Sequence, residues 1–181
     1  MNIDNWARPL TNLEGKLLGI ELESRVESNG VRLLAGMEDE VLHEQHRLIE
    51  RKADWFIENN LYCILSGTAS TQEYLPFVRY MTTSAHTNDR QWLDDVGGHA
   101  CTAIPLVSGD FEVARLNRRF IQEHIGNPIF PILIRNIKQY CDKVIVPIHD
   151  KNHHQMLQAA GVWAVQGEYK PIRFEHCDKL I

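Results

Sequence analysis

Hydrophobic positions along the chain form several short apolar runs and one long amphipathic segment. From Glu38 to Ile57, apolar pairs recur about every two turns, which predicts a helix with one buried stripe. The pairs are Val41/Leu42, Leu48/Ile49 and Trp55/Phe56. Short apolar runs bounded by turn residues predict buried strands. These strands are expected at 16–22, 61–65, 77–81, 113–116, 144–148 and 162–165, and a further one begins at 91–93.

The second half of the chain alternates between strands and helices. Pro131 suits the first turn of a helix that runs to Tyr140, with enough apolar residues to belong to the core. A second helix is expected at 152–160, where Gly161 follows as a cap. Strands that alternate with helices in this way favour a parallel α/β architecture.

The first half fits this architecture less well because its connections are short. Only ten residues, 67–76, separate the strands at 61–65 and 77–81, and nine residues, 82–90, lead to the next strand. A parallel crossover usually needs a dozen or more residues, most of them helical. Either these crossovers have lost their helices or one strand is wrongly assigned.

Composition restricts the class of protein. The chain has 181 residues and a net charge of −5, so we expect a single domain over 1–181 that binds neither nucleic acid nor anionic membrane through a basic surface. The stretch MNIDNWARPL is polar and lacks the apolar core of a signal sequence, and the sequence contains no run of about 20 apolar residues. Four cysteines without a CxxC pair suggest neither a zinc clasp nor a disulfide framework. The prediction is a reduced, cytoplasmic protein.

Two groups of side chains could carry metal chemistry. In WLDDVGGH (92–99), a strand would deliver Asp94 and Asp95 to a metal, although Asp and Gly also favour a simple turn. His43 and His46 share a helix, but the H-E-x-x-H pattern would need histidine at position 47, which is Arg. We therefore expect His43 and His46, like the adjacent pair His153-His154, to face solvent.

Four segments, taken in order, resemble one known family. ARPLTNLEGKLLGIELESR, WLDDVGG, FEVARLNRRFI and VIVPIHDKNHHQMLQAAGVWAVQGEYKP are similar to the opening, DDFGTG, IKIDRSFI and closing segments of EAL domains. EAL domains are cyclic di-GMP phosphodiesterases built on a TIM-like barrel, with active-site residues at the carboxyl ends of the strands. Together with the short connections at 67–90, the resemblance implies an α/β fold, a truncated or incomplete TIM-like (β/α) barrel.

The resemblance also implies which site residues remain. The family uses carboxylates and an asparagine to hold two divalent cations that activate water. The positions that match the family pattern are Glu21, Arg25, Asp94, Asp95 and Gln166. The positions that depart from it are Ile64 for the asparagine, Arg115 and Asn117 for the lysine and aspartate of KID, and Val146 and His149 for the glutamates of EGVE. The glutamates of the fourth strand fall near Met81 and Ser84.

These departures predict that no catalytic residue and no cofactor remain. Three carboxylates offer little negative charge to offset the repulsion between two cations, and Arg115 cannot give up its proton as a lysine can. The chain is therefore predicted to lack phosphodiesterase activity and to bind no cyclic di-GMP. One weakly bound Mg²⁺ or Ca²⁺ at Glu21, Asp94 and Asp95 is an alternative, as is a cyclic di-GMP sensor or a residual phosphodiesterase.

A barrel without its chemistry can persist as a protein-binding module. The chain resembles the degenerate, non-enzymatic EAL proteins of enterobacteria, and 76–86 (PFVRYMTTSAH) loosely resembles a segment of that group. Members of the group bind the FlhD subunit of the flagellar regulator FlhDC and repress motility. The resemblance thus implies FlhD as partner, with a different protein partner as the alternative and the helix at 41–57 or the region 67–90 as contact surface.

Overall fold

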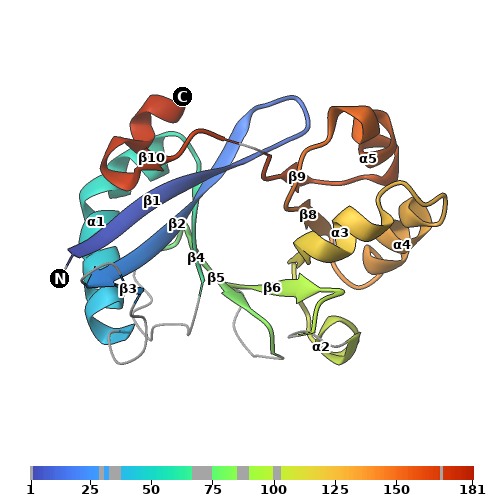
Figure 1. Ribbon diagram of the computed structural model, residues 1–181, viewed down its shortest axis with the longest axis horizontal. Coiled ribbons are helices and arrows are strands. Elements are labelled where there is room, and N and C mark those ends of the chain that lie inside the picture. Colours follow the sequence, from blue (N-terminus) through green and yellow to red (C-terminus); the bar gives the residue numbers. More distant parts are fainter. Residues whose placement is uncertain are drawn as a thin grey trace.

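The computed structural model describes residues 2–28, 31–32, 38–66, 75–84, 90–99, 103–167 and 169–181. Strands and helices follow one another along the chain (Figure 1). The strands are β1 (Asn2–Thr11), β2 (Leu17–Ser28), β3 (Val31–Arg32), β4 (Tyr62–Ser66), β5 (Val78–Thr82), β6 (Gln91–Val96), β7 (Val113–Leu116), β8 (Lys143–Val146), β9 (Ala164–Val165) and β10 (Ile172–Arg173). The helices are α1 (Glu38–Glu58), α2 (Ala103–Ser108), α3 (Arg118–His124), α4 (Phe130–Ile137) and α5 (His154–Ala160), with 3₁₀ segments η1 (Lys151–His153) and η2 (Phe174–Leu180).

Eight of the described strands close into a barrel. The parallel pairs run from β2 through β4, β5, β6, β7 and β8 to β9. The first strand, β1, is antiparallel to both β2 and β9 and so joins the two ends of the sheet. The predicted TIM-like barrel is confirmed, and the ring of strands is complete. Two short strands, β3 and β10, add to its outside edges.

The inside of the barrel is filled by one buried cluster that includes aromatic rings. Residues from seven strands form a buried cluster, among them Ile64, Met81 and Val113. Near the amino ends of the strands, the rings of Tyr62 and Trp92 lie edge to face with their centres 5.0 Å apart. Because side chains alternate along a strand, the next inward positions toward the carboxyl ends form the mouth of the barrel.

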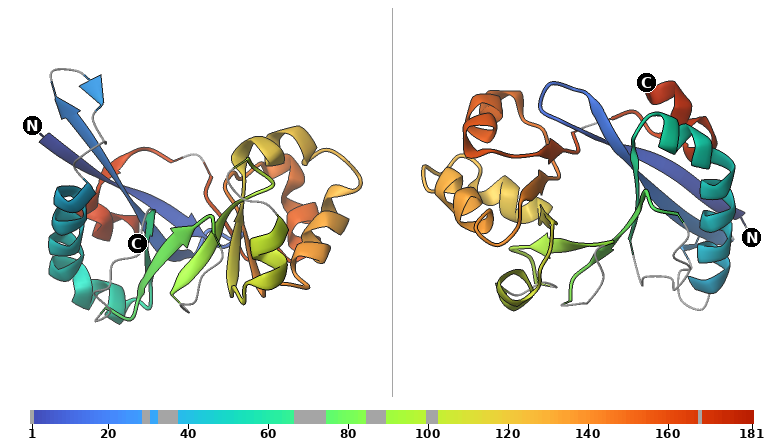
Figure 2. Two further views of the ribbon diagram at one scale, coloured as in Figure 1. Left: turned by 90° about the horizontal axis from the view of Figure 1, so that it is seen from below. Right: turned by 180° about the vertical axis from the view of Figure 1, so that it is seen from behind.

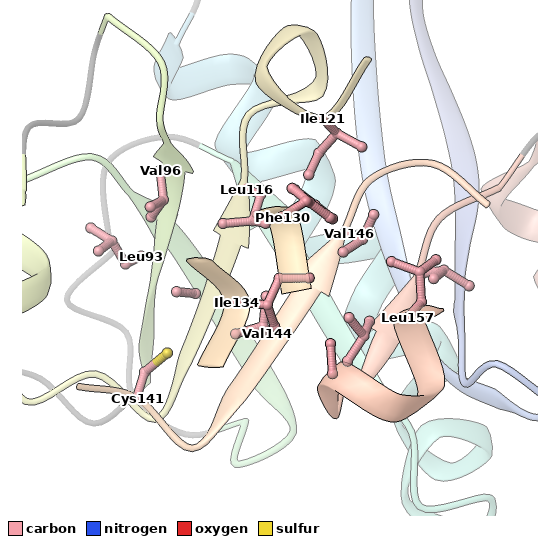
Figure 3. Close-up of a cluster of buried hydrophobic side chains, with 14 of the residues drawn as sticks. Leu93, Val96, Leu116, Ile121, Phe130, Ile134, Cys141, Val144, Val146 and Leu157 are labelled. Atoms are coloured by element: carbon pink, nitrogen blue, oxygen red, sulfur yellow. The ribbon is translucent and has the colours of Figure 1, made fainter. Parts of the chain in front are cut away.

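Helices cover the outside of the barrel in two separate groups (Figures 1 and 2). On one side α1 and η2 pack on β1, β2, β4 and β5, with Phe56 stacked between Phe77 and Phe174. On the other side α3, α4 and α5 cover β6 to β9, where Phe130, Ile134 and Leu157 are fully buried (Figure 3). The two groups of helices therefore hold different halves of one barrel.

Most elements expected from the apolar pattern are present. The structure confirms α1 almost residue for residue, β7, the strand that carries Asp94 and Asp95, and the cap at Gly161, whose φ is 81°. The strand expected to run to Ile148 ends before Pro147, which has no N–H for strand pairing. The expected final strand at 162–165 is followed by β10 and η2, which the pattern did not indicate.

Several expectations fall wholly or partly outside the described residues. The connections within 67–90 include 67–74 and 85–89, so the loss of their helices stays a prediction. In the part of the chain that is described, none of the helices combines the length and apolar character needed to cross a lipid bilayer.

Candidate functional site

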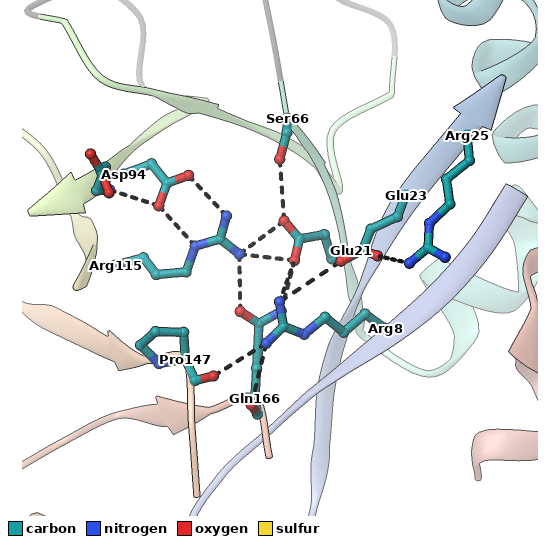
Figure 4. A network of polar contacts seen from close by, with 10 residues as sticks. Arg8, Glu21, Glu23, Arg25, Ser66, Asp94, Arg115, Pro147 and Gln166 are labelled. Carbon is teal, nitrogen blue, oxygen red and sulfur yellow. Dashed lines mark hydrogen bonds and ion pairs between the residues drawn. The ribbon is translucent and has the colours of Figure 1, made fainter. Parts of the chain in front are cut away.

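Five strands bring polar side chains to the mouth of the barrel (Figure 4). Arg115 lies two residues after Val113 on β7, and Asp94 lies two residues after Trp92 on β6, so both share the inward face. Glu21 comes from β2, Ser66 from the end of β4 and Gln166 from the residue after β9. The closed ring places these distant parts of the sequence around one point.

Arg115 is the centre of this cluster. Its Nε and Nη2 donate to the two oxygens of Asp94, each at 2.9 Å, in a bidentate pair. Its Nη1 lies 2.9 and 2.8 Å from the two oxygens of Glu21 and donates to Oε1 of Gln166 at 2.9 Å. The guanidinium therefore occupies the space between the two carboxylates.

The carboxylate of Glu21 is buried and is held by further donors. Glu21 is 3% exposed and Gln166 is 1% exposed. Gln166 donates from Nε2 to Glu21 at 3.0 Å, and Ser66 donates from its hydroxyl at 3.2 Å. Burial by itself would lower the pKa of Arg115, but the charges of Glu21 and Asp94 and the hydrogen bonds to them raise that pKa above its usual value. Arg115 is thus a permanent internal cation.

A second arginine, Arg8, lies at the edge of the cluster. Its Nη1 is 3.9 Å from Glu21 and 3.8 Å from Glu23, and its Nη2 donates to the carbonyl oxygen of Pro147 at 3.2 Å. Arg25 is half exposed and lies 3.9 Å from Glu23, away from the central cluster. Arg25, which matches the family pattern, therefore lies on the rim of the mouth.

The two adjacent aspartates point to different places. The pairing of β6 with β7 shifts between Leu93 and Val96, and Asp95 has a φ of 60°, as in a bulge that re-aims side chains. The carboxylate of Asp95 accepts a hydrogen bond from the side-chain amide of Asn117. Asn117 in turn caps α3 by accepting from the amide of Phe120 at 2.9 Å. The structure brings Glu21, Asp94 and Gln166 together and leaves Asp95 at the start of α3.

Besides Arg115 and Asn117, three other positions that depart from the family pattern lie in different surroundings. Ile64 pairs in register with Glu21 and is fully buried in the apolar interior, so it offers no oxygen ligand. Val146 packs in the outer core with Leu157, so its side chain faces away from the mouth (Figure 3). His149 lies half-buried on the rim, close to His154.

The donor set does not fit a divalent cation. Oxygen atoms of Glu21 and Asp94 are taken by the guanidinium, and Asp95 is turned away. Among the described side chains, no three from His, Cys, Asp and Glu are grouped so that they could hold a metal ion. A cation at Glu21 and Asp94 would have to displace Arg115, whose positive charge would repel it.

Sequence reasoning missed two members of the cluster and misplaced one histidine. Arg8 lies on β1, which was not expected as a strand from its apolar pattern, and Ser66 was seen only as a strand end. His46 was expected to face solvent, but it is buried and neither ring nitrogen has a hydrogen-bond partner among the described residues. His46 is three residues before the buried Ile49 and so lies on the same face of α1, which could have indicated its burial.

Comparison with known proteins identifies the fold. No family model and no curated protein sequence matches the chain. Among solved structures, the EAL-like domain protein YdiV has a TM-score of 0.81 at 20% identity and covers 99% of this chain and 96% of its own. This is an EAL-type fold. An EAL domain protein from Listeria monocytogenes EGD-e has a TM-score of 0.67 at 18% identity, with 98% of this chain and 91% of its own covered.

A third structure with the EAL-type fold contains a ligand. A standalone EAL protein from Vibrio cholerae O395 in its c-di-GMP-bound form has a TM-score of 0.65 at 14% identity, with 96% of this chain and 93% of its own covered. At these identities the likeness extends to the fold.

Proposed function

We propose that this chain is a non-catalytic EAL-like regulator that acts by binding another protein. The observation that supports this most directly is the Arg115 guanidinium, which lies 2.8–2.9 Å from the carboxylates of Glu21 and Asp94. A two-metal mechanism needs those oxygens as ligands. Because Arg115 occupies these oxygens, we expect the described part of the mouth to attract no pair of cations.

Exposed apolar side chains support a role in protein contact. Ile57 at the end of α1 is 58% exposed, and Ile129 and Ile132 at the start of α4 are 49% and 51% exposed. The helix at 131–140 was expected to be wholly core, but only one stripe of α4 is buried, and Ile132 faces outward. Ile129 and Ile132 lie one turn apart and form a small apolar patch of the kind that a partner can cover, whereas a single exposed residue such as Ile57 is common on protein surfaces.

The partner proposed from the sequence resemblance is FlhD, with repression of flagellar genes and motility as the result. Cytoplasmic location belongs to the same proposal. The test is size-exclusion chromatography and calorimetry of the purified chain with purified FlhD. A complex at micromolar concentration is the expected result, and the absence of one would count against FlhD. Co-purification from the native host would then identify a different protein partner.

Cyclic di-GMP binding or residual hydrolysis is the second candidate. A hollow of about 600 Å³ at the mouth, lined by Arg118, His149, Lys151 and Gln166 among others, favours it. Calorimetry with cyclic di-GMP and Mg²⁺ distinguishes it from the first candidate. Turnover of the dinucleotide that disappears in Glu21→Gln would refute a non-catalytic role, whereas binding without turnover would indicate a sensor.

A further inference from the structure

Two histidine rings face each other on the rim of the barrel mouth. His149 follows β8, and His154 is the first residue of α5. The Nε2 atom of His149 lies 3.4 Å from Nδ1 of His154, and the ring centres are 5.7 Å apart. This separation is longer than the usual range for a hydrogen bond from a ring N–H. The two ring nitrogens therefore form a long hydrogen bond, and the tautomer decides which of them donates.

The chain between the two histidines is held in a defined conformation. Asp150 caps the 3₁₀ turn η1 by accepting from the amide of Asn152 at 2.9 Å, and its second oxygen lies 3.0 Å from Nδ1 of His153. The ring of His153 is thereby bound to Asp150. On the other side, a Cβ at Gly167 would lie 2.9 Å from Cβ of His149, so the chain after β9 packs closely against this residue.

The pair is open to solvent on the side where a ligand would enter. His149 and His154 line one hollow of about 510 Å³, together with Leu13, Lys151, Asn152 and Gln155. His149 also lines the neighbouring hollow of about 600 Å³. This volume accommodates a metal ion and the water molecules that would complete its coordination.

We propose that His149 and His154 bind a divalent transition-metal ion of the Zn²⁺ class. With Zn–N bonds of about 2.0–2.1 Å and tetrahedral angles, two ligand nitrogens lie about 3.3–3.4 Å apart, as His149 Nε2 and His154 Nδ1 do here. Imidazole is a preferred ligand of Zn²⁺, Cu²⁺ and Ni²⁺, whereas Mg²⁺ and Ca²⁺ prefer oxygen. The ion would join the segment after β8 to α5.

The nearby charges set the strength of this site. Lys151 lines the same hollow and opposes a cation. Asp150 follows His149 directly in the chain, and its carboxylate has the opposite charge to Lys151. With two protein ligands and water at the remaining positions, the site is exchangeable, unlike a closed structural zinc site.

Calorimetry of the full chain with ZnCl₂ tests the proposal. We expect one ion per chain, with the affinity lowered about tenfold or more in both His149→Ala and His154→Ala. The matched control is His43→Ala, which removes an exposed imidazole on α1 that plays no part in this site and should keep the wild-type affinity. Electron paramagnetic resonance of the Cu²⁺ form should show two imidazole nitrogens.

Three results would overturn it: no binding to the wild type, binding that neither His149→Ala nor His154→Ala weakens, or an equal loss in His43→Ala. Melting curves without metal check that each variant folds. A Zn²⁺-induced rise in melting temperature that both ligand variants lose, and the control keeps, gives a second measurement in favour.

Discussion

Replacing Arg115 by methionine tests the role given to the guanidinium. Methionine keeps much of the volume and removes the charge, so the carboxylate of Glu21, which is 4% exposed at its side chain, loses its main counter-charge. Breaking a buried ion pair by removing one partner destabilises a protein by about 3–5 kcal/mol. We expect the lower end, about 3 kcal/mol, because Asp94 is 24% exposed at its side chain and Arg8 remains 3.9 Å from Glu21.

The assay is urea unfolding, with the melting temperature as a second measurement. For a chain of this size, about 3 kcal/mol corresponds to a fall of roughly 6–12 °C. The matched control is Arg119→Met, because Arg119 pairs with Glu123 on an exposed helix face, where such a pair contributes about 0.3–0.5 kcal/mol.

A double variant separates lost attraction from an uncompensated charge. In Arg115→Met/Glu21→Gln the buried negative charge is also removed, so part of the lost stability should return, as a double-mutant cycle measures. If Arg115→Met unfolds at the same urea concentration as Arg119→Met, the guanidinium does not hold the mouth together and the reasoning fails.

Three further predictions concern other parts of the chain. Asn117→Ala removes the cap of α3 and the donor to Asp95, and should lower the free energy of unfolding by about 1 kcal/mol in urea. Gly161→Ala places a side chain at a φ of 81° and against Nζ of Lys138, so calorimetry should show a loss of about 1 kcal/mol or more. Burial lowers the pKa of His46 despite the opposing effect of Glu50, so the folded state disfavours a protonated His46. The free energy of unfolding should therefore fall as the pH drops below about 6.5, the ordinary pKa of histidine, and His46→Leu should flatten this part of the stability–pH curve.

The apolar pattern was sufficient to predict most strands of the sheet and its longest helix. The period of α1 and the compact runs of β4 and β7 reflect burial directly, so they could be predicted. β1 could not, because Pro9 and several polar residues interrupt it and its partners, β2 and β9, lie on both sides of it in the barrel.

The sequence allowed us to predict which residues lie at the mouth of the barrel, but not which of them contact one another. The resemblance placed Glu21, Asp94 and Gln166 at strand ends, and the structure brings them together. It treated Arg115 as a substituted residue, since nothing local in the sequence relates it to Glu21, which lies 94 positions earlier. The divergence of Asp94 and Asp95 depends on a bulge, and sequence spacing alone does not reveal a bulge.

The position of Arg115 has a consequence for the conditions under which the barrel remains intact. A carboxylate site that relies on magnesium is filled or emptied with the supply of the ion, and a chelator removes its counter-charge. Here the counter-charge is attached to the polypeptide itself and reaches both carboxylates. We therefore expect the balance of charge at the mouth to be set when the chain folds and not to change with the cell's supply of magnesium.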